Sequence, residues 1–293
     1  MTQLSQPIAV IGATGQQGGS VVDALLARQQ EVRALVRDPE SAGARALRNR
    51  GVEVVAADQE NGESLQRALS GAAALFFMTT FEGPEGTEGE VRRGLSVADA
   101  AARAGVPRVV YSSVGAAERS TGIPHFESKC RVERRLSEVV ATKFVRPTFF
   151  MENLAPQLAD DGSGELVLRL PVAGDVPIQM VAVRDIGAAA AGILVDPDAV
   201  DGDAVELAGD ELTMAQVADR VAAVLNRPTR YEGLPLGVLG DDDDMRAMFQ
   251  WFTTVPAYRA DFDVTRRLVP DVRDFASWVS ERERASSGTG AAS

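Results

Sequence analysis

The stretch that decides the fold is Ile8–Ser20, IAVIGATGQQGGS, near the start of the chain. A short β-branched run stops at Gly12, and glycines then recur at the spacing G-x-x-G-x-x-G. This spacing lets the chain turn tightly after a strand and brings backbone N–H groups close to a pyrophosphate at the start of a helix. Glycine turns also serve only to join a strand to a helix. An apolar stripe with helical spacing at 21–26 favours the phosphate-binding alternative.

Length and composition limit the class of protein. A chain of 293 residues, 45% of them hydrophobic, can bury one large core or a large core with a smaller lobe. No apolar run approaches the roughly 20 residues that span a bilayer, and the first residues do not resemble a secretory signal, so we expect a cytoplasmic protein with no membrane partner. The net charge of −12 disfavours binding to nucleic acid. With one cysteine and one histidine, a Cys/His zinc site cannot be built, and we expect no metal.

From residue 6 to about 146, short β-rich runs alternate with helical stripes. The predicted strands are 7–11, 31–36, 52–57, 74–78, 108–112 and 143–146. Segment 87–104 lies between the fourth and fifth of these strands and carries Val91, Leu95, Ala98 and Ala102 on one face. This spacing predicts a helix that packs on the sheet. The alternation is typical of a parallel sheet covered on both faces, so we predict an α/β fold with a Rossmann-type, doubly wound parallel sheet.

The ends of the predicted strands indicate which cofactor is bound. In this fold the residue that ends the second strand meets the adenosine ribose, and here it is Arg37. A guanidinium can pair with a 2′-phosphate but cannot accept a bond from a free 2′-hydroxyl, so we expect NADP(H) rather than NAD; a solvated surface arginine is the alternative. Asp58 and Gln59 end the third strand, where an acid can accept the adenine amino group, and Met78 and Thr79 end the fourth. Either pair can equally be ordinary strand-end residues.

The regular rhythm breaks up after residue 149. Short strands are predicted at 165–170 and 178–183, followed by a helix at 184–195, and Thr213–Gln216 forms a capping box that opens another helix. Four acids at 241–244 favour the start of a helix, and a calcium or magnesium site is the alternative. We expect residues 1–150 to form an NAD(P)-binding Rossmann domain and 151–284 a smaller mixed α/β lobe, with 178–195 able to return to the core. Residues 285–293 are expected to form a disordered tail.

Several segments together resemble the NmrA-like family of atypical short-chain dehydrogenase/reductases. They are, in order, IGATGQQGG, VRALVRDP, GVEVVAADQENGESLQRAL, VVYSSVG, HFESK and RPTFFMENL, and the likeness covers residues 7–195 well. The resemblance implies that the glycine turn carries the pyrophosphate, that the second strand's arginine holds the 2′-phosphate, and that other residues contact adenine, ribose and nicotinamide. The residues so implied are Gly12, Thr14, Gly15, Gln16, Gln17, Gly18, Arg37, Asp58, Gln59, Thr79, Lys129, Phe150 and Asn153.

The catalytic position departs from the wider superfamily. In the wider superfamily that this chain resembles, active members use Y-x-x-x-K, in which tyrosine is the acid/base and lysine holds the nicotinamide ribose. Here the pattern is His125-Phe-Glu-Ser-Lys129. The spacing still places both side chains on one helix face. Ser113 matches the superfamily's substrate-polarising serine. Histidine can protonate a reduced carbonyl, and a capping or packing histidine is the alternative. Lys129, His125 and Ser113 are therefore the catalytic candidates.

Two functions fit these residues. The resemblance favours an NADP(H)-binding redox sensor, in which the bound nucleotide sets the conformation of the smaller lobe and its choice of protein partner. The alternative is an NADPH-dependent reductase of a small carbonyl, quinone or imine. In that case Ser113 orients the substrate, and His125 or a water molecule supplies the proton. The two functions share the cofactor site, and turnover separates them.

Overall fold

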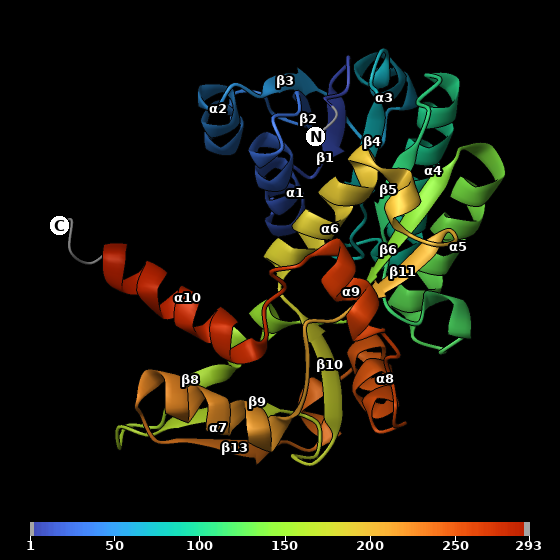
Figure 1. Ribbon diagram of the computed structural model, residues 1–293. Helices are drawn as coiled ribbons and strands as arrows, with labels where there is room; N and C mark the ends of the chain where they lie inside the picture. The colour runs from blue at the N-terminus through green and yellow to red at the C-terminus, as the bar shows by residue number, and fades with distance from the viewer. Residues whose placement is uncertain (1–2, 290–293) are drawn as a thin grey trace. The chain divides into compact units, whose positions relative to one another are not determined.

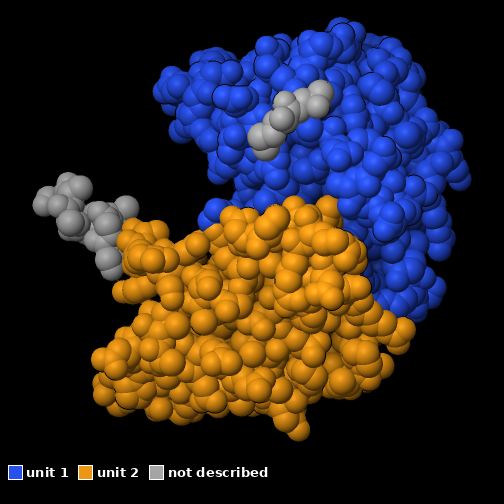
Figure 2. Space-filling view, in the orientation of Figure 1, with its two compact units in different colours: residues 1–146, 183–206 blue, residues 147–182, 207–293 orange. Residues whose placement is uncertain are grey.

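The computed structural model describes residues 3–289 (Figure 1). The chain forms two compact units, which Figure 2 colours separately. Unit 1 comprises the residues up to 146 together with 183–206, and unit 2 comprises 147–182 together with the residues from 207 on. The sequence predicts a boundary at residue 150 and a returning segment at 178–195. In the structure the chain leaves unit 1 after Arg146 and returns to it over 183–206.

Unit 1 is built on a seven-stranded sheet with the strand order β11-β6-β5-β4-β1-β2-β3. The strands are β1 (Ile8–Ile11), β2 (Val32–Val36), β3 (Glu53–Ala56), β4 (Ala74–Met78), β5 (Val109–Ser112), β6 (Thr142–Pro147) and β11 (Ala204–Leu207). Strands β1 to β6 pair in parallel. The six predicted strands and the Rossmann-type fold are therefore confirmed, whereas β11 adds a strand that the sequence did not indicate.

Helices connect the strands of unit 1 and cover both faces of the sheet (Figure 1). They are α1 (Gln16–Ala27), α2 (Ala42–Asn49), α3 (Gly62–Leu69), α4 (Gly86–Arg103), α5 (Pro124–Val139) and α6 (Val183–Val195), with short turns η1 (Ala117–Arg119) and η3 (Pro197–Ala199). Two helices begin at capping side chains: Ser41 accepts from the backbone N–H of Ala44, and Asn61 from that of Ser64.

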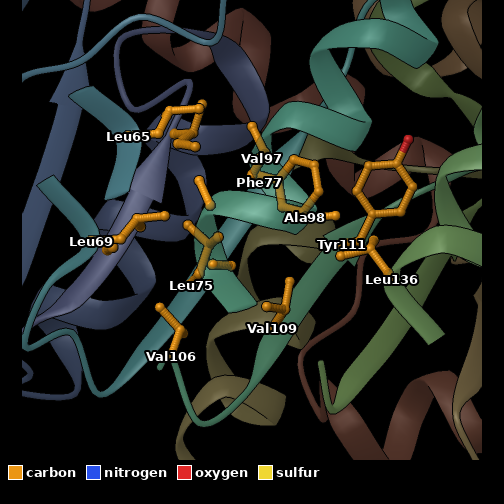
Figure 3. Close-up of a cluster of buried hydrophobic side chains, with 14 of the residues drawn as sticks. Leu65, Leu69, Leu75, Phe77, Val97, Ala98, Val106, Val109, Tyr111 and Leu136 are labelled. Carbon is orange, nitrogen blue, oxygen red and sulfur yellow. The ribbon is translucent and has the colours of Figure 1, made fainter. Parts of the chain in front are cut away.

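The main core of unit 1 lies between the sheet and helices α3, α4 and α5. Figure 3 shows apolar side chains from all of these elements in contact, among them Leu69, Leu75, Val109 and Leu136. Tyr111 packs its ring in this core, with 4.8 Å between its centroid and that of Phe77. The core therefore ties α4 and α5 to the carboxyl-terminal halves of β4 and β5, where functional side chains are expected.

Unit 2 holds two three-stranded sheets, β12-β10-β7 and β13-β9-β8. Its strands are β7 (Phe149–Phe150), β8 (Leu158–Asp160), β9 (Leu166–Leu170), β10 (Pro177–Val181), β12 (Asp210–Thr213) and β13 (Thr229–Gly233). Its helices are η2 (Met151–Gln157), α7 (Met214–Leu225), η4 (Leu236–Leu239), α8 (Asp243–Phe252), α9 (Phe262–Leu268) and α10 (Phe275–Thr289).

Local predictions for unit 2 hold at two helix starts. The capping box of α7 is confirmed, because Thr213 accepts from the N–H of Gln216 and the Gln216 side chain accepts from the N–H of Thr213. The acids at 241–244 do lie at the start of a helix, with two of them in its first turn, and Asp242 caps it by accepting from the N–H of Met245 at 3.0 Å. The tail predicted at 285–293 differs: α10 continues to residue 289, and residues 290–293 lie outside the described part. No described helix is long and apolar enough to cross a membrane.

Candidate functional site

A cavity of about 880 Å³ lies in unit 1 where the strand order reverses. Strands β2 and β3 extend from one side of β1, and β4, β5 and β6 from the other. The cavity is lined by residues at the carboxyl ends of β1, β2, β3 and β4, beginning with Ile11 and Gly12. Ligands of open α/β sheets bind at this switch point, and the volume is in the range of sites for cofactors and small molecules.

The glycine turn forms the start of the cavity. Gly12 has a φ of +79°, in the left-handed region that favours glycine. A Cβ atom on Gly18 would lie 2.2 Å from the carbonyl oxygen of Gly12, so only glycine lets α1 begin this close to β1. Gly15 is the N-cap of α1 and offers no side chain to its first turn. The backbone N–H groups of that turn therefore remain available to an anion.

The second residue of α1 ties the turn to the neighbouring strand. The Gln17 side chain accepts a hydrogen bond of 2.7 Å from the hydroxyl of Ser112, the last residue of β5. Gln16 beside it is exposed. The sequence predicts a cofactor role for both glutamines, and the structure assigns Gln17 an additional contact that fixes the position of α1 over the sheet.

Arg37 lies on the cavity wall directly after β2. Its side chain is exposed, and within residues 3–289 no carboxylate lies at ion-pair distance from its guanidinium. The adjacent Asp38 is engaged in its own turn, where its carboxylate accepts from the N–H of Glu40 at 2.8 Å. Arg37 is therefore a cation on the wall of a cavity with its donors available, which is the arrangement that an incoming phosphate requires.

The opposite wall contains charged residues that the sequence did not single out. Arg93 of α4 donates to the carbonyl oxygen of Thr80 at 2.9 Å and to Glu60 at 3.4 Å, while Arg92 bonds to Glu60 and Glu85. These contacts join the end of β3, the segment after β4 and the start of α4. Because two of the acidic side chains on this wall are paired with arginine, they repel an anionic ligand less than free carboxylates would.

A buried polar network lies beside this cavity, around Lys129 of α5. The Lys129 ammonium donates to the carbonyl oxygen of Thr79 at 2.9 Å and to Glu90 of α4 at 2.6 Å. The Thr79 hydroxyl donates to Glu90 at 2.9 Å and lies 2.7 Å from the hydroxyl of Tyr111, and Ser128 donates to the other carboxylate oxygen of Glu90. Glu90 has no exposed surface. A buried carboxylate is tolerated in a protein when it is paired and hydrogen-bonded in this way.

The other catalytic candidates differ in their surroundings. The His125 ring is 8% exposed and packs between two aromatic rings, face-on against Phe81 and edge-on against Phe126, each with 4.7 Å between centroids. Ser113 is buried, and its hydroxyl has no hydrogen-bond partner in the described chain. Burial and the charge of Glu90 raise the pKa of the Tyr111 phenol well above its usual value.

The structure thus brings together only some of the predicted site residues. Those on the cavity wall are Gly12, Thr14, Arg37, Asp58, Gln59 and Met78. Gly15, Gln16, Gln17 and Gly18 belong to the adjoining turn, and Thr79 turns its hydroxyl into the buried network instead of the cavity. Phe150 and Asn153 lie in unit 2, so their roles stay predictions.

Glu90 is the main residue that sequence reasoning missed. Of the predicted α4 stripe, Val91 and Ala98 are buried and Leu95 and Ala102 only half-buried. A second row of buried positions runs through Gly94, Val97 and Ala101. Glu90 continues that second row, at i−4 and i−7 from Gly94 and Val97. An acid in line with buried small residues was therefore the available signal.

Comparisons with known proteins agree on one family. The model of the NmrA-like family matches residues 5–278. The NmrA-like family domain-containing oxidoreductase FrzB of Cladobotryum sp is 34% identical over 257 residues, 77% of this chain and 75% of that protein. NADPH-dependent quinone oxidoreductase QOR2 of Escherichia coli, solved with NADPH, is 26% identical with a TM-score of 0.76, covering 94% of this chain and 99% of that one. NmrA, a negative transcriptional regulator, shares the fold with a TM-score of 0.79 and 23% identity, covering 97% and 98%.

Proposed function

The chain belongs to the NmrA-like family, and we propose that it binds NADP(H) in the cavity of unit 1 and uses NADPH to reduce a small carbonyl, quinone or imine. The observation that carries the cofactor assignment is the placement of Arg37. Its available guanidinium lies on the wall of a cavity that begins at a glycine turn and an uncapped helix. Names of the relatives support the reductase: FrzB is an oxidoreductase, and QOR2 is an NADPH-dependent quinone oxidoreductase.

Each chemical group of NADP(H) has a candidate partner among the residues of unit 1. The N–H groups at the start of α1 bind the pyrophosphate, and Arg37 pairs with the 2′-phosphate. Asp58 and Gln59 line the cavity after β3, where we assign them to the adenine, and Met78 lines it at the end of β4. When bound, NADPH would supply the hydride that reduces the acceptor. Lys129 and Ser113 then act as donors that orient oxygen atoms, and His125 or a water molecule supplies the proton.

A nucleotide-responsive regulator is the second candidate, and one observation favours it. His125 stands where the superfamily has its catalytic tyrosine, and its ring is packed between Phe81 and Phe126. This packing gives the His125 ring a structural role that needs no proton transfer. In this alternative the chain binds NADP(H), undergoes no turnover, and uses the bound nucleotide to select a protein partner.

Cofactor preference tests the proposal at Arg37. Only NADPH offers a 2′-phosphate to the guanidinium, and a charge-assisted hydrogen bond contributes about 1.5–3 kcal/mol, so wild type should bind NADPH about 10- to 150-fold more tightly than NADH. Arg37→Ala should remove most of this preference while leaving the affinity for NADH nearly unchanged. Isothermal titration calorimetry with both nucleotides measures the two ratios.

Arg48→Ala is the matched control, because Arg48 is another arginine close by in sequence but pairs with Glu40 and does not line the cavity. This variant should keep the preference of wild type. Equal affinities of wild type for NADPH and NADH would contradict the assignment of Arg37 to the 2′-phosphate.

A further inference from the structure

Glu90 contacts two candidate site residues, Lys129 and Thr79, which makes its geometry informative. The carboxylate accepts from three side chains, Lys129, Thr79 and Ser128, and is completely buried. Because the Thr79 hydroxyl gives its hydrogen to Glu90, the Tyr111 hydroxyl must donate to Thr79. Every hydrogen in this part of the network therefore points toward the carboxylate, as expected for an ionised group.

Lys129 has one donor left over. An ammonium group carries three N–H bonds, and two of them have acceptors, the Glu90 carboxylate at 2.6 Å and the Thr79 carbonyl oxygen at 2.9 Å. Within the part of the chain that the structure describes, no third acceptor is present for this ammonium. The Lys129 side chain is 11% exposed, so it is not sealed off from a ligand.

Ser113 adds a second donor at the same place. Met78 of β4 lies opposite Ser112 of β5, so Thr79 and Ser113 are the next neighbours in register, and a hydrogen bond from the Ser113 N–H to Val145 continues the ladder. Side chains two residues apart in a strand point to the same face. Ser113 therefore faces the side on which Tyr111 and Thr79 meet Lys129, and its buried hydroxyl lacks a partner among residues 3–289.

The positive charge of Lys129 is balanced by the carboxylate of Glu90. Glu90 lies at 2.6 Å from the Lys129 ammonium, so the two ionised groups together present a dipole instead of a net positive charge. An unpaired lysine would attract a carboxylate or sulfonate of the substrate, whereas a compensated lysine offers hydrogen bonds without that attraction. The site thus provides two donors and no net charge, which suits a neutral oxygen.

We propose that Glu90 is a positioning residue that holds Lys129 and cancels its charge, so that the enzyme selects electrically neutral acceptors such as a quinone or an aldehyde over acceptors that carry an anionic group. This inference rests on the proposed reductase function. It predicts that the preference between neutral and anionic acceptors changes with the charge of the Glu90–Lys129 pair, even though Glu90 itself touches neither cofactor nor acceptor.

Glu90→Gln tests the inference with little disturbance of the network. The glutamine oxygen can still accept from Lys129 and Thr79, and its amide can donate to Ser128, whose hydroxyl hydrogen then goes to the carbonyl oxygen of His125, already 3.0 Å away. The contacts of this position with Lys129, Thr79 and Ser128 are therefore kept, and the negative charge is lost. We expect the ratio of kcat/KM for a naphthoquinone sulfonate to kcat/KM for the unsubstituted naphthoquinone to rise at least about tenfold, which corresponds to about 1.4 kcal/mol.

Lys129→Met is the second variant and has the opposite expected sign. It leaves the Glu90 carboxylate without its cation, so the same ratio, measured at saturating NADPH and at alkaline pH where the carboxylate is ionised, should fall below that of wild type. The double variant of Glu90→Gln and Lys129→Met contains neither charge and should return toward the wild-type ratio. A merely structural role of Glu90 predicts no such pair of opposite shifts, because loss of packing affects both quinones alike.

Glu88→Gln is the matched control. Glu88 also joins α4 to α5 through an ion pair, with Arg131, but this pair is exposed at the surface. Its loss should leave the ratio unchanged. If wild type turns over and the ratio is the same in Glu90→Gln and Lys129→Met, the inference is overturned while the proposed function stands. If wild type binds NADPH but reduces neither quinone nor any aldehyde, the proposed function fails and the inference falls with it.

Discussion

The glycines at positions 12, 15 and 18 meet different physical demands, although the sequence presents them as one motif. Gly12 adopts a positive φ, and Gly18 lies so close to the carbonyl oxygen of Gly12 that a Cβ atom would approach within 2.2 Å. At Gly15, by contrast, φ is −95° and a Cβ atom would lie 3.4 Å from its nearest neighbour. The fold therefore requires glycine at 12 and 18, whereas at 15 it leaves room for a Cβ atom, and the proposed phosphate contact is what would require glycine there.

A pair of substitutions separates these demands. Gly15→Val should fold, at a cost of about 1 kcal/mol for a poorer helix start, but lose NADPH affinity by at least about tenfold because the side chain occupies the approach to the phosphates. Gly18→Ala should lower the free energy of unfolding by about 1–3 kcal/mol. Thermal unfolding followed by circular dichroism and NADPH titration give both quantities. Undiminished NADPH binding by Gly15→Val would show that the pyrophosphate lies elsewhere.

At the residue scale, the sequence predicted what depends on position along a strand. Arg37 follows β2 directly, and the order of strands alone predicts that it meets the ribose of a bound nucleotide. Glu90 and Thr79 were different, because their roles depend on contacts between α4, β4 and α5 that are distant in sequence. A glutamate in an amphipathic helix is usually solvated, and only the helix packing shows that this one is buried.

Among the elements, α4 and α5 determine the geometry of the buried network. They approach closely at Gly94, where a Cβ atom would lie 2.4 Å from a methyl group of Val132. Glu90 precedes Gly94 by one turn, and Lys129 precedes Val132 by about one turn. The glycine therefore permits the helix separation at which the carboxylate reaches the ammonium at 2.6 Å.

Gly94→Ala should force these helices apart. We expect a loss of about 1–3 kcal/mol in the free energy of unfolding, together with weaker NADPH binding because Lys129 is displaced from Glu90. Val132→Ala removes the opposing methyl groups and should restore much of both losses when combined with Gly94→Ala. Chemical denaturation and NADPH titration of the two single variants and the double variant give the coupling energy between the positions. Additive effects would mean that this contact does not set the position of the pair.

Elements with a strong periodic pattern were also the ones that the sequence predicted. Strands β1 to β6 are short apolar runs between helices, and all six were expected within about two residues of their observed bounds. Strands β7, β8, β11, β12 and β13 were not, because they do not alternate regularly with helical stripes, which is the pattern that marked the equally short β1 to β5. Their existence depends on pairing with partners far along the chain, as in β13 with β9.

For the whole molecule, the two units divide the predicted site residues between them. Lys129, His125 and Ser113 belong to unit 1, and Phe150 and Asn153 to unit 2, so function must be measured on the full chain. The sequence predicted two units but not the residues at which the chain passes from one to the other. The second segment of unit 1, residues 183–206, is marked only by a helix and a four-residue strand. Tertiary packing decides which sheet such a segment joins.

Turnover by the full chain decides between the two candidate functions. As a reductase, purified wild type should oxidise many equivalents of NADPH per chain with a quinone or carbonyl acceptor, followed by the loss of NADPH absorbance. His125→Phe preserves an aromatic ring against Phe81 and Phe126 but carries no exchangeable proton. If His125 is the proton donor, this variant should bind NADPH as wild type does and turn over about 10²- to 10⁴-fold more slowly.

His125→Tyr is the complementary variant, since it installs the acid of the wider superfamily at the same position on α5 and should keep or raise the rate of turnover. Equal rates in wild type and His125→Phe would assign the proton to water and leave His125 a packing role between its two aromatic neighbours. Tight NADPH binding by wild type without steady turnover on any acceptor would overturn the reductase and leave the nucleotide-responsive regulator. The Glu90–Lys129 pair would then serve to hold the nucleotide alone, because a regulator needs the ammonium to orient a ribose hydroxyl but has no acceptor to select.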